Sequence, residues 1–168
     1  MIEQVINILS TLPKELVTFI ISMLPISELR GAIPYGLSVG LDLKTIIPIV
    51  IIGNLIPVIP ILFLLEPVSE YLRRFGIFKK FFDWLFERTR KKAKLVEKYE
   101  ILGLILFVAI PLPITGAWTG SVAASLFKVR LRYAFLAIAI GVCIAAVIVT
   151  TVCLIGKGIF YSVFIPHY

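Results

Sequence analysis

Long apolar segments alternate with short breaks that contain proline, glycine or charged residues. Residues 43–65 and 131–157 are each a continuous apolar segment, longer than the roughly 20 residues that a helix needs to cross the hydrocarbon core of a bilayer. Residues 14–41 and 100–128 are also apolar, but Pro25 and Pro113 interrupt them halfway. The pattern predicts an all-α integral membrane protein with two full transmembrane helices.

The two interrupted segments predict re-entrant helical hairpins. Each arm beside Pro25 or Pro113 holds about 10 to 14 residues, too few to cross the bilayer. We therefore expect each segment to enter to mid-depth and to leave on the same side. Non-helical backbone at that depth has to be buried in protein or face water, so Pro25, Ile26 and Ser27 should be shielded from lipid. Ser27 is the expected N-cap of the second arm.

The two halves of the chain repeat each other. Leu24–Ser27 matches Leu112–Thr115 at an offset of 88 residues, and Gly53 matches Gly141 at the same offset. A constant offset is typical of an internal repeat. Since each half has one hairpin without a net crossing and one full span, the hairpins should enter from opposite faces. This predicts an inverted-topology repeat, as in many secondary transporters.

We accordingly expect one membrane domain over residues 1–168, with repeat one at 14–65, a connector at 66–99 and repeat two at 100–157. Residues 2–12 have apolar residues at helical spacing, which indicates an amphipathic helix in the membrane interface. Four helix breakers predict a kink or local unwinding in the span 43–65: Pro48, Gly53, Pro57 and Pro60. Gly156–Gly158 is expected to close the span 131–157.

Composition and charge support a membrane location. Hydrophobic residues make up 60% of the chain and charged residues 16%. Of the 17 Lys and Arg, ten lie between Arg73 and Lys98. Basic clusters beside apolar spans mark cytoplasmic loops, so residues 66–99 and 128–132 should be cytoplasmic and both termini outside, in a multi-pass plasma-membrane protein. This distribution argues against nucleic acid as a partner. The connector should form a basic amphipathic helix, either simply solvated or in contact with anionic lipid.

Enzyme chemistry finds no support in the sequence. Cys143 and Cys153 lie in one apolar segment, and His167 is the single histidine. These residues offer no metal-ligand spacing, and there is neither a nucleophile–base pair nor a phosphate-binding glycine loop. We expect no catalytic residues, no metal and no cofactor.

Glu28 and Arg30 are the main candidates for a functional site, since both should lie near the first hairpin tip. An ionisable residue at mid-membrane is costly unless it is paired or hydrated, and it commonly marks a transport pathway. Two interpretations are open: a structural ion pair, or a site for a substrate or proton. Residues two apart do not face each other on a helix, so Glu28 is open to another partner.

The second arms add further candidates. Their N-termini, at Ser27 and Thr115, should point into the protein centre, where helix dipoles favour an anion such as phosphate. Asp42 is either a solvated helix-end residue or an acid at the entry side. The remaining candidates are polar, small or aromatic residues near the expected centre: Asn54, Gly116, Trp118 and Thr119.

The stretches Glu28–Pro34 and Pro111–Gly120 resemble the two signatures of the small multidrug export proteins, and the likeness covers roughly residues 15–155. That family is similar in predicted architecture to the DedA superfamily. This resemblance implies two re-entrant hairpins, proton-coupled transport and recycling of polyprenyl-phosphate carriers, or lipid scrambling as in eukaryotic relatives. DedA proteins place arginines in the second hairpin, where Gly116, Ala117 and Trp118 stand here, which weakens the phosphate-lipid interpretation.

The expected function is that of a DedA-like secondary transporter of an amphipathic or lipid-phosphate substrate, such as polyprenyl phosphate, coupled to protons. The alternatives are a small multidrug (organic cation) exporter, a passive lipid scramblase and a structural membrane protein without transport. Membrane lipids are expected partners. With only two full spans to shield a polar site, we expect a homodimer packed partly through small residues: Gly116, Gly120, Ala123 and Ala124.

Overall fold

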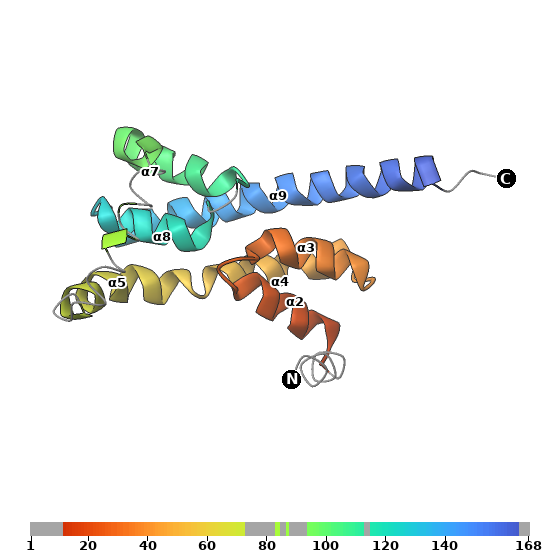
Figure 1. Cartoon of the computed structure of the whole chain (residues 1–168), viewed down its shortest axis with the longest axis horizontal. Coiled ribbons are helices and arrows are strands. Elements are labelled where there is room, and N and C mark those ends of the chain that lie inside the picture. Colours follow the sequence, from red (N-terminus) through yellow and green to blue (C-terminus); the bar gives the residue numbers. More distant parts are fainter. Residues whose placement is uncertain (1–11, 73–82, 85–86, 88–93, 113–114, 165–168) are drawn as a thin grey trace. The chain divides into compact units, whose positions relative to one another are not determined.

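The computed structural model describes residues 12–72, 83–84, 87, 94–112 and 115–164 (Figure 1). Within these ranges all regular structure is helical. The interfacial helix predicted at 2–12, the end of the chain after Phe164 and most of the basic connector lie outside the described residues.

Residues 14–38 form a helical hairpin. Helix α2 (Lys14–Met23) begins after Pro13, and helix α3 (Glu28–Ser38) follows a short turn. The two helices pack along each other, and the Lys14 ammonium donates a hydrogen bond of 2.8 Å to the Val39 carbonyl just beyond α3. The start of α2 therefore lies at the end of α3, as a hairpin requires.

The first apolar span is broken in the middle, as predicted. Helix α4 (Leu43–Leu55) ends at the Ile56–Pro57 turn, and helix α5 (Val58–Leu72) begins directly after it. Pro57 has no N–H and cannot donate to the carbonyl four residues earlier, so the hydrogen-bond ladder stops there. Residues Leu43–Leu65 are long and apolar enough to cross a membrane. Helix α5 continues past residue 65, where the connector was expected to begin, up to Leu72.

The second half has the same order of elements. Helix α7 (Lys94–Ala109) has a non-helical kink at Glu100, and helix α8 (Ala117–Leu126) packs against it. Helix α9 (Leu131–Phe164) contains the second span, Leu131–Gly156. The apolar span ends at Gly156, close to the expected Gly156–Gly158, but the helix itself continues to Phe164. A glycine in a helix costs only about 1 kcal/mol, which is too little to stop a helix that remains apolar beyond it.

The 88-residue offset recurs in the backbone hydrogen bonds. The Leu41 N–H donates to the Gly36 carbonyl at 2.9 Å, and at the same offset the Val129 N–H donates to the Ala124 carbonyl at 2.9 Å. Such a bond spanning five residues is the helix-closing bond of a Schellman motif. Both second arms therefore end in the same way, which gives the repeat a structural basis. The membrane faces from which the hairpins enter stay a prediction.

Glycine in each span lets the first arm of its hairpin approach closely. A Cβ atom at Gly53 in α4 would meet the Ser22 hydroxyl of α2, and a Cβ at Gly141 in α9 would lie 2.7 Å from the Val108 Cβ of α7. Small residues allow close helix contact in membranes, where packing replaces the hydrophobic effect. The matched glycines Gly53 and Gly141 thus have the same packing role.

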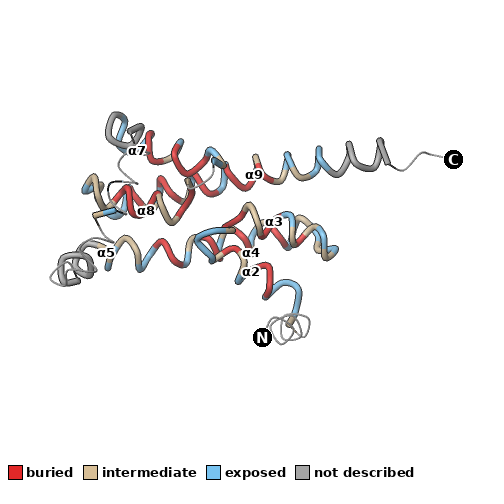
Figure 2. Tube along the Cα trace, viewed as in Figure 1, coloured by how far each residue is buried: buried red, intermediate tan, exposed pale blue. Residues whose placement is uncertain are grey.

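The chain divides into two compact units, residues 1–53 with 146–168 and residues 54–145. Each unit contains buried residues, which are coloured red in Figure 2. Its apolar core includes Ile33, Ile46 and Val50 in the first unit and Leu104, Val108, Ile138 and Val142 in the second.

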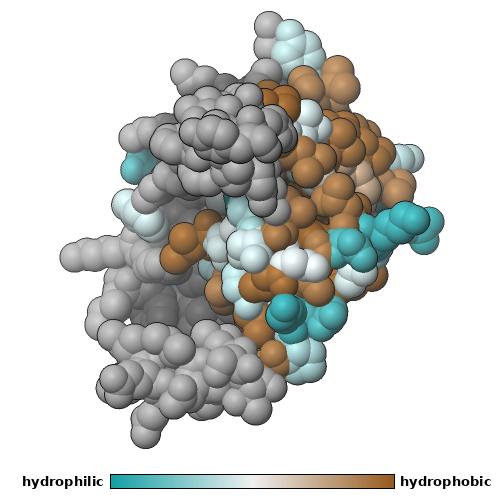
Figure 3. All heavy atoms as spheres, turned by 90° about the vertical axis from the view of Figure 1, so that its right-hand side faces the viewer, coloured by the Kyte–Doolittle hydropathy of each residue, from teal (hydrophilic) through white to brown (hydrophobic). Residues whose placement is uncertain are grey.

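The outer surface of the spans is apolar. In each span, only 33% of the most apolar stretch of 18 residues is buried. Figure 3 shows hydrophobic side chains over much of the described surface. Large exposed apolar patches mark contact with lipid or protein. Together with the two long apolar helices, this surface is that of a membrane protein.

Candidate functional site

Glu28 is the first residue of α3 and the only carboxylate buried among the described residues, with 6% of its surface exposed. Its backbone has φ of 46°, a left-handed conformation that is uncommon outside glycine. Its N–H donates to the Leu24 carbonyl at 2.9 Å, across the turn. The turn itself therefore fixes the position of the carboxylate.

Arg30 is half-buried, and its positive charge interacts with the charge of Glu28. The positive φ of Glu28 sets this residue apart from the regular helical geometry on which the expected separation of residues two apart was based. The tip of the first hairpin thus combines a buried acid with a base that reaches the surface.

Pro34 lies within α3, one turn after Arg30. Proline has no N–H, so Pro34 cannot donate the usual helical hydrogen bond to the Arg30 carbonyl. The helical ladder is interrupted beside the charged pair. A local interruption of this kind makes α3 easier to deform at the candidate site.

Ser27 occupies the N-cap position of α3, but its side chain makes no capping bond. Instead the Ser27 hydroxyl donates to the Ile21 carbonyl of α2 at 2.9 Å. The hydroxyl therefore ties the two arms of the hairpin together and is not available as a simple helix cap.

We expected the rest of the chain to shield Pro25, Ile26 and Ser27 from lipid, and this expectation is wrong for Pro25 and Ile26. Pro25 is exposed, Leu24 is 49% exposed and Ile26 is 97% exposed, whereas Ser27 is half-buried. Membrane lipid excludes unpaired backbone groups and tolerates apolar side chains. The Leu24 and Glu28 N–H groups are both bonded inside the turn, so its exposed apolar side chains need no protein cover.

At the tip of the second hairpin, a hydroxyl again bonds to a backbone carbonyl of the first arm. The Thr115 hydroxyl lies 2.9 Å from the carbonyls of Ile110 and Leu112 and 3.2 Å from the Leu112 nitrogen. Gly116 has φ of 153° and ψ of −165°, a region that only glycine adopts readily. Helix α8 then begins at Ala117, two residues later than predicted. Thr115 and Gly116 thus shape this turn.

The other candidates lie apart from the charged pair in the sequence. Trp118 and Thr119 are half-buried in the first turn of α8. Asp42 is exposed, and its carbonyl accepts the Thr45 and Ile46 N–H groups at 2.9 Å at the start of α4. This is the geometry expected of a helix-end residue.

Asn54 is buried, with 1% of its surface exposed, as its predicted inward orientation requires. Neither its amide nitrogen nor its amide oxygen has a hydrogen-bond partner in the described part of the chain. Burial of an unpaired amide in an apolar helix lowers the free energy of unfolding. A substitution of Asn54 can test this effect.

The candidates fall into both compact units. Ser27, Glu28, Arg30 and Asp42 belong to the first, and the remainder to the second: Asn54, Thr115, Gly116, Trp118 and Thr119. The first unit brings Glu28 and Arg30 together. Convergence of the two hairpin tips on one anion site stays a prediction.

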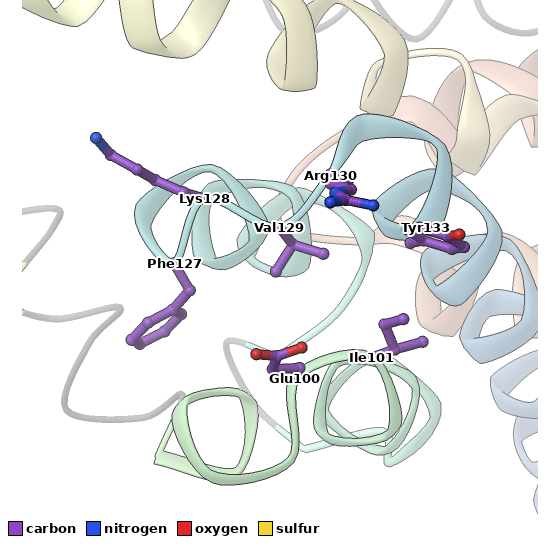
Figure 4. Close-up of a pocket in the computed structure, with 7 residues that line it drawn as sticks. All are labelled: Glu100, Ile101, Phe127, Lys128, Val129, Arg130 and Tyr133. Atoms are coloured by element: carbon purple, nitrogen blue, oxygen red, sulfur yellow. The ribbon is translucent and has the colours of Figure 1, made fainter.

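A cavity of about 440 Å³ at the open end of the second hairpin was missed by the sequence analysis (Figure 4). Its polar residues come from the kink of α7, from the connection between α8 and α9, and from the first turn of α9. The basic residues at 128–132 were noted only as a marker of the cytoplasmic side. The lining residues are Glu100, Ile101, Phe127, Lys128, Val129, Arg130 and Tyr133.

Comparison with known protein families identifies a matching family. A family model described as "Putative small multi-drug export protein" matches residues 28–148. The match begins at Glu28 and includes Arg30, the second hairpin and more than half of the second span. No curated protein and no solved structure matches the chain.

Proposed function

The chain belongs to the family of small multi-drug export proteins, and from this premise we propose that it is a secondary transporter whose substrate competes with Glu28 for Arg30. The observation that carries the proposal is the buried Glu28 carboxylate beside the half-buried Arg30. Ionisable groups at membrane depth commonly belong to transport pathways.

The charged pair gives a simple exchange mechanism. While Glu28 is ionised, its carboxylate neutralises Arg30 and an anion gains little by binding. When Glu28 takes up a proton, Arg30 loses its counter-charge and can bind an external anion. Proton and anion therefore bind together, which couples their movement. Lower pH should favour substrate binding.

The proposed substrate is an amphipathic anion, such as a lipid phosphate of the polyprenyl-phosphate type. A guanidinium binds phosphate oxygens through two parallel hydrogen bonds, which an ammonium cannot reproduce. The exposed apolar residues of the hairpin tip, Leu24 and Ile26, offer a surface for the apolar part of such a substrate. Proton coupling, the likeness to the DedA superfamily and a homodimeric state belong to this proposal.

A second candidate is export of an organic cation, which the family description favours. Here the cation would replace Arg30 as the partner of ionised Glu28. The pH dependence is then reversed, because protonation of Glu28 removes the binding charge. Passive lipid scrambling would need neither charge and would not respond to pH. In a purely structural role, the pair would stabilise the hairpin without any flux.

Transport into proteoliposomes tests the proposal. Wild-type protein should carry a polyprenyl phosphate in preference to a hydrophobic organic cation, and faster at lower pH. Arg30→Lys keeps the charge but loses the planar fork, so it should reduce phosphate transport about tenfold or more. Arg132→Lys, an exposed arginine at the start of α9, is the matched control. Transport of the cation alone would favour the second candidate.

Topology and location complete the proposal. We place residues 66–99 and 128–132 on the cytoplasmic side of the plasma membrane and both termini outside. The positive charge of these segments supports this orientation.

A further inference from the structure

We infer that the cavity at the open end of the second hairpin binds a phospholipid headgroup that combines a phosphate with a primary ammonium, as in phosphatidylethanolamine. The inference does not depend on the transport proposal, because the cavity is lined by residues that the proposed exchange at Arg30 does not use.

Opposite charges line this cavity without neutralising one another. Glu100 lies on one side beside Ile101, Arg130 lies on the other with Val129 between the two charges, and the Lys128 ammonium points away (Figure 4). In the part of the chain that the structure describes, no ion pair joins Glu100 to Arg130 or Lys128. A ligand that carries both charges can therefore bind both groups at once, whereas a pure anion would face the Glu100 carboxylate.

The backbone at the cavity is held in an uncommon conformation. Glu100 and Lys128 have φ of 44° and 53°, and together with Glu28 they are the residues other than glycine with positive φ among those described. A positive φ at such residues is costly, and observed cases occur at helix ends, as at Lys128, and at binding sites. The kink at Glu100 interrupts α7 and positions this carboxylate at the cavity.

The depth of the cavity favours a lipid over a soluble ligand. The second apolar span begins at Leu131, which in a bilayer would place Arg130 at the boundary of the hydrocarbon core. Arginine and tyrosine at this boundary interact with lipid headgroups. The cavity also has apolar walls from Ile101, Phe127 and Val129, which suit the glycerol and upper chain of a phospholipid.

Each polar group has a defined task in this site. Arg130 donates two hydrogen bonds to the phosphate oxygens, and the Tyr133 hydroxyl donates a third. Glu100 accepts hydrogen bonds from the primary ammonium. A choline headgroup has three methyl groups on its nitrogen and cannot donate these bonds, while a glycerol headgroup has no positive charge for Glu100.

Native mass spectrometry of the full chain, purified in mild detergent, tests the site. The protein is titrated with equal amounts of phosphatidylethanolamine, phosphatidylcholine and phosphatidylglycerol. We expect the ethanolamine lipid to bind about tenfold more tightly than either of the others, as the loss of one charge-assisted hydrogen-bond pair implies. Equal binding of all three lipids would overturn the inference.

Variants assign the preference to the cavity. Glu100→Gln should abolish the preference for ethanolamine over glycerol headgroups, and Arg130→Gln should weaken binding of the ethanolamine lipid about tenfold. Tyr133→Phe is a milder variant, with an expected loss of about threefold. Arg132→Gln is the matched control, because it removes the same charge from a nearby residue that does not line the cavity. An equal effect of Arg132→Gln would contradict the assignment.

A soluble competitor distinguishes a lipid headgroup from a free molecule with the same phosphate and ammonium groups. O-phosphoethanolamine has the same phosphate and ammonium but no acyl chains. If the site recognises a lipid, this compound should bind at least about a hundredfold more weakly than phosphatidylethanolamine, because it lacks the apolar contacts. Comparable affinity would show a site for a soluble ligand and overturn the lipid assignment.

Discussion

Gly40 and Lys128, which lie 88 residues apart in the sequence, hold the same left-handed backbone conformation at the ends of α3 and α8. Their φ angles are 82° and 53°. In both places the following N–H closes the helix through a bond of 2.9 Å to the carbonyl five residues earlier. The two repeats therefore share this conformation although one has glycine and the other has lysine at the position. The effect of the residue type on stability can be measured.

Lys128→Gly should stabilise the protein by about 1 kcal/mol, because glycine adopts a left-handed conformation without the steric cost that lysine incurs. Gly40→Ala should destabilise it by a similar amount, although nothing lies within 4 Å of the added methyl group. Thermal unfolding in detergent, followed by circular dichroism, measures both changes. A loss of stability in Lys128→Gly, or no loss in Gly40→Ala, would show that the two helix ends are not equivalent.

Gly120→Ala should destabilise the second unit by about 1 to 3 kcal/mol through overpacking. The added Cβ would lie 2.5 Å from a methyl carbon of Val108 on α7. Val108→Ala removes that methyl group, so the double variant should recover part of the loss. Unfolding free energies of the two single variants and the double variant give the coupling between α7 and α8.

Gly156→Ala is the matched control for this series, since nothing lies within 4 Å of its added methyl group. It should leave stability unchanged or increase it by up to about 1 kcal/mol, because alanine is a better helix former. A lack of any recovery in the Gly120→Ala, Val108→Ala double variant would show that these residues are not in contact.

Single cysteines at positions 14 and 42 should react with an impermeant reagent from the same side of the membrane. Both native residues, Lys14 and Asp42, are exposed, and the bond from Lys14 to the Val39 carbonyl holds the open end of the hairpin together. Labelling of intact cells before and after permeabilisation measures the side. Reaction from opposite sides would mean that residues 14–41 cross the membrane.

Asn54→Leu should raise the free energy of unfolding by about 1 to 3 kcal/mol, because it removes a buried amide without a hydrogen-bond partner among the described residues. Leucine has a similar size and suits the apolar α4. Denaturant unfolding in detergent measures the difference. A loss of stability would mean that the amide is paired in the membrane, and a loss of transport at full stability would make Asn54 part of the pathway.

Much of the fold follows from local patterns in the sequence. Pro25 follows the end of α2 as expected, and the first span breaks at Pro57, one of the four breakers expected there. The lengths of the two spans were predicted within a residue or two. The 88-residue offset predicted the equivalent roles of Gly53 and Gly141. These features depend on residue type and spacing alone, since proline and glycine act on their own backbone.

The chemistry of the site was harder to predict. Glu28 and Arg30 were recognised as a pair of charges at a hairpin tip, but the positive φ of Glu28 could not be predicted, because residues other than glycine seldom adopt it. Ser27 was assigned as a helix cap, whereas its hydroxyl bonds to Ile21 across the turn. The cavity near Arg130 joins segments about 30 residues apart, which periodicity does not bring together.

The pH dependence of transport by Glu28→Gln tests the exchange mechanism most directly. Wild-type protein in proteoliposomes should carry polyprenyl phosphate faster as the pH falls, because protonation of Glu28 frees Arg30. Glu28→Gln is neutral at every pH, so its transport should be independent of pH and should exceed that of wild type at high pH. Glu15→Gln, an exposed acid in the first turn of α2, is the control and should behave as wild type. Folded Glu28→Gln protein with the wild-type rate and the wild-type pH dependence would contradict the central claim.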